Sequence, residues 1–342
     1  MTPDVLPDVL RAVRLTGAVF FDFKLAPPWV AEAPASQEIA DRVMPGAERV
    51  IEYHLVASGQ AWGHAVGDEP LRLGEGDLLI FPQGDPHVLS SAPGMRAKPD
   101  LTLFRRSSSA LPFVHELGNQ GQDDKSRIIC GFLGCDERPF NPLLAALPRV
   151  IHLPAARHDP MNWSLASLLD VAARESGRGQ PGTENVLARL SELLFVEAIR
   201  RYLLALPDTE RGWLAGLRDP VVGRALAAIH AAPRDEWTVE SLGRTVGASR
   251  TALAARFTEM VGHPPMQYVT LWRMQLASRL LRSGQQVAEV ADAVGYASEA
   301  AFSRTFKKLM GVPPAQWKRE RSHDREAHRT QVAVAGRASS LA

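Results

Sequence analysis

Residues 298–309 place basic, polar and very small side chains on one face of a predicted helix. Phe302, Phe306 and Leu309 recur at i, i+4 and i+7, which predicts a buried stripe along the other face. Ser298 precedes this helix and is suited to cap its N-terminus. The outward face and its edge then carry Glu299, Ala300, Ser303, Arg304, Lys307 and Lys308. Small residues allow close approach to a DNA groove, and long basic side chains supply donors for base edges and phosphates.

Residues 249–260 repeat this arrangement earlier in the chain. Leu253 and Phe257 predict the buried stripe, and Ser249 is placed to cap the helix. The outward face carries Arg250, Thr251, Ala254, Ala255 and Thr258, with Arg256 next to it. We therefore expect two helices that contact DNA, of which the second is richer in basic residues and makes the stronger contact.

Two histidines, His54 and His87, form a second group with chemical potential. Each lies in or at the start of a predicted strand, and three interpretations are open. They are interior histidines satisfied by hydrogen bonds, or they are polar contacts of an effector pocket together with Trp62 and His64. In the third interpretation they bind a metal ion, completed by His64, Cys130 or a carboxylate.

Cys130 and Cys135 are the two cysteines of the chain. Residues five apart on a continuous strand face opposite sides, so these thiols could pair only after a bend at Gly131 or Gly134. Buried, inert thiols are the favoured interpretation, and a redox-sensing pair is the alternative.

The two outward helices belong to a repeated unit. The stretch FTEMVGHPPMQY, residues 257–268, recurs as FKKLMGVPPAQW, residues 306–317. In each copy a short helix, a glycine-containing turn and the outward helix follow in order, which is typical of a helix-turn-helix. The connector between the copies predicts a helix of about 18 residues, or about 27 Å, close to the 34 Å of one DNA turn. The two helices therefore suit successive major grooves, and this doubling disfavours a purely structural helical domain.

The remaining chain divides by pattern. Short apolar runs broken by Gly, Pro and Asp predict a β-rich region at about 15–155, with a long loop at about 93–126. Helical periodicity then begins. The expected organisation is an N-terminal domain at 1–206 with helices at about 162–176 and 184–206, a linker at 207–218, a DNA-binding domain at 219–320 and a disordered tail at 321–342.

Composition narrows the class of protein. A length of 342 residues with 45% hydrophobic residues suits two globular domains. Residues 1–218 carry an acidic excess and residues 219–320 a basic one, as expected if only the second part contacts nucleic acid. We find no apolar run that could span a membrane and no signal peptide, so a cytoplasmic protein is expected.

The stretch VADAVGYASEAAFSRTFKKLMGVPPAQWKR resembles the signature of AraC/XylS-type transcription regulators, over residues 219–320 as a whole. The resemblance assigns base-facing positions in the second helix-turn-helix to Glu299, Ala300, Ser303 and Arg304. In the first helix-turn-helix it assigns them to Thr251, Ala254 and Ala255. Many relatives have Arg at the position of Ala255, so direct readout there would fall to Arg250, Thr251 and Arg256.

The stretch GEGDLLIFPQGDPHVL, residues 74–89, is similar to the second motif of the cupin barrel, in which the histidine is a metal ligand. The first cupin motif supplies His-x-His, whereas here Val56 follows His54 at the second histidine position. The resemblance therefore implies an α+β protein: a cupin-like β-barrel followed by helices, then an all-α domain with two helix-turn-helix motifs joined by a linker helix.

A sequence-specific DNA-binding regulator is the function that this organisation implies. The expected partners are double-stranded DNA, RNA polymerase, a small-molecule effector in the barrel and a second copy of the chain; activation is expected, and no cofactor beyond an optional metal. The alternative is a metal-dependent cupin enzyme of the dioxygenase or isomerase type. The incomplete His-x-His motif disfavours it.

Overall fold

The computed structural model describes residues 5–13, 15–104, 113–118, 125–155, 182–207 and 211–320, with residues 168, 171–172 and 174–175. The chain forms two compact units. One comprises residues 15–136 and 147–205, and the other comprises residues 1–14, 137–146 and 206–342. The predicted helix at about 162–176 lies largely outside the described residues, and the tail at 321–342 lies entirely outside them.

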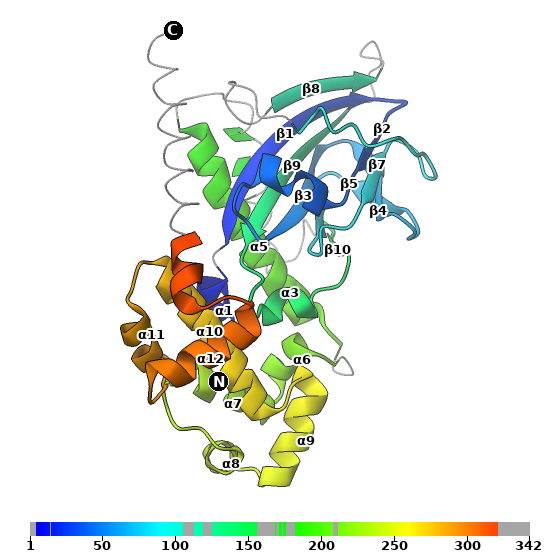
Figure 1. Cartoon of the computed structure of the whole chain (residues 1–342). Helices are drawn as coiled ribbons and strands as arrows, with labels where there is room; N and C mark the ends of the chain where they lie inside the picture. The colour runs from blue at the N-terminus through cyan, green and yellow to red at the C-terminus, as the bar shows by residue number, and fades with distance from the viewer. Residues whose placement is uncertain are drawn as a thin grey trace. The chain divides into compact units, whose positions relative to one another are not determined.

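The first unit is built on two β-sheets (Figure 1). Strand order in the larger sheet is β10-β6-β3-β9-β1-β8, and in the smaller sheet β2-β7-β4-β5. The strands are β1 (Thr16–Ala26), β2 (Val30–Ala33), β3 (Arg49–Ser58), β4 (Gln60–Ala65), β5 (Leu71–Gly74), β6 (Leu78–Phe81), β7 (His87–Ser90), β8 (Phe113–Gly118), β9 (Ser126–Cys135) and β10 (Ile151–Leu153). The helix α2 (Ser36–Val43) lies between β2 and β3 in the chain.

Alternation along the central strands explains the position of the core. Phe21, Phe23 and Leu25 of β1 are buried in one apolar cluster with Phe132 of β9. Residues two apart on a strand point to the same face, so these strands present one apolar face to the interior between the sheets.

Strand β8 corrects the expectation of a loop over residues 93–126. Phe113–Gly118 pairs in parallel with β1, with Phe21 opposite Phe113 and Ala26 opposite Gly118. The polar residues on either side obscure the short run FVHELG in the sequence, and its partner strand lies far away in the chain. Non-local pairing of this kind leaves no local pattern to detect.

Helix α5 (Thr183–Ala205) covers the face of the larger sheet that points away from the core. The Tyr53 hydroxyl on β3 hydrogen-bonds the Ser191 hydroxyl at 2.6 Å. Gly17 allows this close packing, because a Cβ there would lie 2.5 Å from the backbone oxygen of Ala188. The helix predicted at 184–206 is therefore present, and its inner face packs on the sheet.

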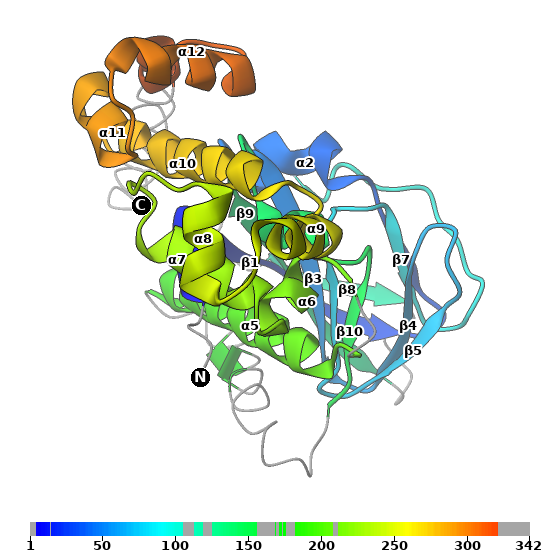
Figure 2. The ribbon, with the colours of Figure 1, turned by 90° about the horizontal axis from the view of Figure 1, so that it is seen from below.

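The second unit is helical (Figure 2). Its helices are α1 (Leu6–Ala12), α3 (Pro142–Ala146), α6 (Trp213–Arg218), α7 (Val222–Ala231), α8 (Val239–Val246), α9 (Arg250–Val261), α10 (Pro265–Arg282), α11 (Val287–Ala293) and α12 (Glu299–Met310). Part of the stretch interpreted as a linker at 207–218 is thus helix α6, whose Trp213 and Leu214 are buried. No helix within the described part of the chain is long and apolar enough to cross a membrane.

Both helix-turn-helix units form as the sequence predicts. The Ser249 and Ser298 hydroxyls accept hydrogen bonds from the backbone N–H groups of Ala252 and Ala301, which caps α9 and α12. The buried stripe of α12 differs from the prediction in one residue. Met310 is buried in the core cluster with Phe302 and Phe306, whereas Leu309 is 37% exposed.

Candidate DNA-binding surface and effector cavity

Of the two candidate DNA surfaces, the one on helix α12 has more exposed cationic side chains that form no ion pair with a described residue. Glu299, Ala300, Arg304, Lys307 and Lys308 are exposed, and Ser303 is half-buried. Across the described ranges, no carboxylate forms an ion pair with Arg304, Lys307 or Lys308. These three cations are therefore available to phosphates and base edges without the loss of an internal contact.

Helix α9 presents fewer available cations. Thr251, Ala255 and Arg250 are exposed, but the Arg250 guanidinium forms an ion pair with Glu240 of α8 at 3.1 Å. Arg256 donates to the buried carboxylate of Asp219, with Nη2 at 2.6 Å and Nε at 2.8 Å from Oδ2.

Asp219 also accepts hydrogen bonds from the backbone N–H groups of Val221 and Val222 at the start of α7. Arg256 thereby joins α9 to α7, and contact with a base would cost this internal pairing. Ala254 is half-buried, so direct readout by α9 is left chiefly to Arg250 and Thr251.

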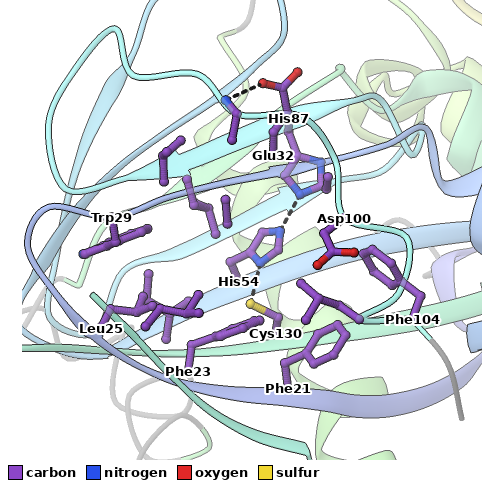
Figure 3. Close-up of a pocket in the computed structure, with 18 of the residues that line it drawn as sticks. Phe21, Phe23, Leu25, Trp29, Glu32, His54, His87, Asp100, Phe104 and Cys130 are labelled. Carbon is purple, nitrogen blue, oxygen red and sulfur yellow. Dashed lines mark hydrogen bonds between the residues drawn. The ribbon is translucent and has the colours of Figure 1, made fainter. Parts of the chain in front are cut away.

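The first unit contains a cavity of about 260 Å³ between its two sheets (Figure 3). Strands β1, β2, β3, β7 and β9 and the segment at 97–104 contribute to its wall. The apolar part of the wall comprises Phe21, Phe23, Leu25, Trp29, Leu89, Leu103, Phe104, Leu117, Ile128 and Phe132. A mainly apolar, concave site of this kind is typical of small-molecule binding.

His54, His87 and Cys130 meet in the cavity wall through a chain of hydrogen bonds (Figure 3). His87 Nδ1 lies 2.9 Å from the backbone oxygen of Asp85, His87 Nε2 lies 2.7 Å from His54 Nε2, and His54 Nδ1 lies 2.8 Å from Cys130 Sγ. A carbonyl oxygen only accepts, so His87 Nδ1 must carry a proton. If both imidazole rings are neutral, this proton fixes the direction of the other two hydrogen bonds. His54 Nε2–H donates to His87 Nε2, and the Cys130 thiol donates to His54 Nδ1.

Burial keeps all three groups uncharged. It lowers the pKa of His54 well below its ordinary value and that of His87 to about 4, and it raises the pKa of the Cys130 thiol. Desolvation disfavours the charged form of each group. The hydrogen bonds that link the Asp85 carbonyl, His87, His54 and Cys130 therefore form a neutral network. This arrangement agrees with the interpretation of interior histidines satisfied by hydrogen bonds.

Glu52, His54 and His87 are buried with ligand atoms within 4.8 Å of one another, which raises the question of a metal ion. In favour, Glu52 Oε1 has no hydrogen-bond partner. Against it, His54 Nε2 and His87 Nε2 share one proton, so only one of these nitrogens offers a lone pair. Two nitrogens 2.7 Å apart are also closer than ligands of one tetrahedral ion, whose Zn–N bonds are about 2.0–2.1 Å. The arrangement therefore does not fit a bound metal ion without rearrangement, and we assign none.

The other predicted pocket residues, Trp62 and His64, lie outside the cavity lining, whereas the redox candidate Cys130 belongs to it. Trp62 and His64 both lie on β4, and His64 is buried. Neither Cys130 nor Cys135 forms a disulfide, and both are buried on strand β9, whose register with β3 is unbroken between them. Five residues of strand span about 16 Å, far beyond disulfide reach, so the alternative of a redox-sensing pair does not fit this strand. Burial of both thiols agrees with the favoured interpretation.

Sequence reasoning missed the aromatic wall and Glu52. Phe21, Phe23 and Leu25 alternate as an inward strand face should, and this signal was present in the sequence. Glu52 lies two residues before His54, on the same face of β3, which strand alternation could also have shown. The convergence of β1, β3, β7 and β9 on one cavity, in contrast, depends on pairing between distant segments.

Two family models match the chain. One described as Cupin matches residues 4–204, and one described as a helix-turn-helix domain matches residues 242–320. An AraC-like transcription regulator of Streptomyces lividans is 33% identical over 277 residues, covering 80% of this chain and 88% of that protein. This chain belongs to the AraC family of transcription regulators.

The chain is also similar to a second regulator and, over its C-terminal part, to a solved DNA-binding domain. The HTH-type transcriptional regulator MtrA of Neisseria gonorrhoeae is 29% identical over 322 residues, covering 93% of this chain and 98% of that protein. The solved DNA-binding domain of AdpA, in complex with a target DNA, is 28% identical with a TM-score of 0.29, covering 30% of this chain and 92% of that one.

The expected α+β class, with a cupin domain before two helix-turn-helix motifs, is therefore confirmed, and the protein is a DNA-binding transcription regulator. Its relatives are regulators rather than enzymes, which decides against the cupin enzyme.

Proposed function

We propose that a small molecule bound in the cavity of the cupin unit controls how this AraC-family regulator binds its operator. The observation that carries the proposal is the cavity itself: about 260 Å³, mainly apolar, inside a protein whose other unit binds DNA. A regulator has no catalytic use for such a cavity, and ligand binding is the use that its size and lining support.

In this proposal, α9 and α12 enter successive major grooves of one DNA face. Arg304 contacts a base edge, and Lys307 and Lys308 contact phosphates. Exposure of these side chains and the absence of ion pairs to them within the described chain support these roles. The α9 contact is made by Arg250 and Thr251, and it is the weaker of the two.

We further propose a homodimer formed through α5. Val186, Leu193 and Leu204 are exposed, at 44%, 52% and 65%, and their spacings of 7 and 11 residues place them on one stripe of the helix. An apolar stripe of this kind favours burial against a second copy. Contact with RNA polymerase and activation of transcription complete the proposal.

Two neighbouring isoleucines of β9 provide a matched test of the effector site. Ile128 lines the cavity, whereas Ile129 points to the opposite face, and both are 1% exposed. Ligands are found by a thermal-shift screen of small aromatic compounds, and operator affinity is measured with and without each hit. Ile128→Phe should weaken the ligand effect on operator affinity at least about tenfold through lost cavity volume. Ile129→Phe, which adds the same bulk outside the cavity, should respond like the parent protein; equal responses in both variants would refute the effector site.

A further inference from the structure

The cavity wall carries aromatic rings on several sides. Phe21 and Phe23 come from β1, and Phe104 comes from the segment that follows β7 (Figure 3). Phe132 of β9 also lines the cavity. The rings of Phe21 and Phe104 meet edge-to-face with centroids 5.6 Å apart. Such walls favour a flat ring system, which can stack on one ring and meet the edge of another.

The two histidines and the cysteine of the buried wall are already satisfied by hydrogen bonds along one network. The chain from the Asp85 carbonyl through His87 and His54 to Cys130 uses every donor of these side chains. All three groups are neutral, so this part of the wall offers neither a charge nor a free N–H group to a ligand.

The charged residues of the wall also leave the interior uncharged. The Glu32 carboxylate accepts two hydrogen bonds from Arg96, at 2.8 and 2.6 Å, and one from the backbone N–H of Ala97. Asp100 is exposed and accepts from the backbone and hydroxyl of Thr102. Among the described wall residues, Lys98 is the cation without an ion pair, and it lies exposed rather than in the buried part of the wall. A charged ligand in the buried part would lose its hydration and find no described counter-charge beside it.

Among the described residues of the wall, one buried side-chain polar atom lacks a hydrogen-bond partner. Trp29 is 5% exposed and lines the cavity, and its indole Nε1–H makes no hydrogen bond. An indole N–H is a donor only. A buried donor left unpaired costs about 1–3 kcal/mol, which a ligand oxygen placed against it would recover.

We propose that the cavity selects an uncharged, ring-bearing molecule with one hydrogen-bond acceptor, which Trp29 engages, and that it excludes carboxylates of the same shape. This inference rests on the proposed effector role of the cavity and specifies its ligand class.

Three probes of one scaffold separate the parts of this inference. Naphthalene has no acceptor, 2-acetylnaphthalene is neutral with one carbonyl acceptor, and 2-naphthoate has nearly the same shape with a negative charge. Their dissociation constants are measured by calorimetry with the full chain at pH 7. The ketone should bind about 2–10-fold more tightly than naphthalene through the hydrogen bond. The carboxylate should bind at least about tenfold more weakly than the ketone.

Trp29→Phe tests the donor directly. This variant keeps the aromatic wall and removes the N–H, so it should bind the ketone and naphthalene with nearly equal affinity. Trp62→Phe is the matched control, because Trp62 lies on β4 outside the cavity lining. It should retain the preference of the parent protein for the ketone.

The outcomes separate this inference from the effector role. Binding of 2-naphthoate as tight as the ketone, or an unchanged ketone preference in Trp29→Phe, overturns the ligand class and leaves the cavity as a binding site. Ketone binding that leaves operator affinity unchanged at saturation contradicts the effector role for this ligand class. Failure of all three probes to bind overturns the inference.

Discussion

Arg304 is the side chain on which specific DNA readout depends most. It is exposed on α12, makes no ion pair with any described residue and has the bidentate donors that match a guanine edge. Arg304→Ala should weaken binding to the specific operator by about 1–3 kcal/mol and leave binding to random DNA much less affected.

Lys307→Ala is the matched comparison on the same helix. Loss of a phosphate contact should lower affinity for operator and random DNA by similar factors and reduce the salt slope by about one. Fluorescence anisotropy at several salt concentrations measures both effects. Equal losses on the two DNAs for Arg304→Ala would contradict its role in reading bases.

Glu52 makes the stability of the cupin unit depend on pH. Burial raises the pKa of its carboxyl to about 8 from an ordinary value of 4.5. Between these values the folded protein retains a proton that the unfolded chain has released. The Glu52 carboxyl therefore lowers the stability of the folded protein least below about pH 4.5, and stability is lost as pH rises through about 8.

Glu52→Gln keeps the shape and removes the titration. Its free energy of unfolding should exceed that of the parent protein at pH 8, with the gap closing towards pH 4.5 by up to about 1.4 kcal/mol per pH unit. Urea denaturation at four pH values measures the gap. A gap that is constant with pH would show that Glu52 does not titrate in this window.

Helix α10 holds two chain segments far from it in sequence. The fully buried side chain of Gln275 donates to the Ala12 carbonyl at 3.2 Å and accepts from the Phe140 N–H at 3.2 Å. It thereby connects the end of α1, the stretch before α3 and the connector helix within the helical unit. A single amide side chain satisfies both groups.

Gln275→Leu should destabilise the helical unit, because it leaves a buried donor and acceptor without partners, at about 1–3 kcal/mol each. Gln285→Leu, at an exposed position just after α10, is the control and should have little effect. Chemical denaturation of the two variants gives the comparison. Similar midpoints for both would show that the contacts of Gln275 contribute no net stability.

The assembly of the whole protein depends on the exposed stripe of α5. Leu193→Glu places a charge in the centre of that stripe and should convert the proposed homodimer to a monomer, as measured by sedimentation. Val114→Glu makes the same change at an exposed position of β8 and should leave the dimer intact. The dimer surface would lie elsewhere if Leu193→Glu remained dimeric.

The helices of the second unit could be predicted from local sequence signals, whereas much of the cupin unit could not, because its strands pair with segments that are distant in sequence. Ser249 and Ser298 cap α9 and α12 as predicted, and α10 runs from Pro265 to Arg282, because caps and proline act within a few residues. Leu309 differs from the prediction because i+7 and i+8 lie on opposite edges of the stripe set by Phe302 and Phe306, at about −20° and +80° from Phe302, and the core lies on the Met310 side. The cavity and the hydrogen-bonded network from His87 to Cys130 require strands that are distant in sequence. Local pattern therefore identifies His54 and His87 as candidates but contains no signal for their arrangement.

Selection of binding sites from random DNA by the full-length protein tests the central claim most directly. Two helix-turn-helix units on one connector should select two conserved sequence blocks, centred about 10–10.5 base pairs apart on one DNA face. The block contacted by α12 should carry more information, and Arg304→Ala should reduce the information in that block alone. A single conserved block, or an equal loss from both blocks in Arg304→Ala, would contradict the account.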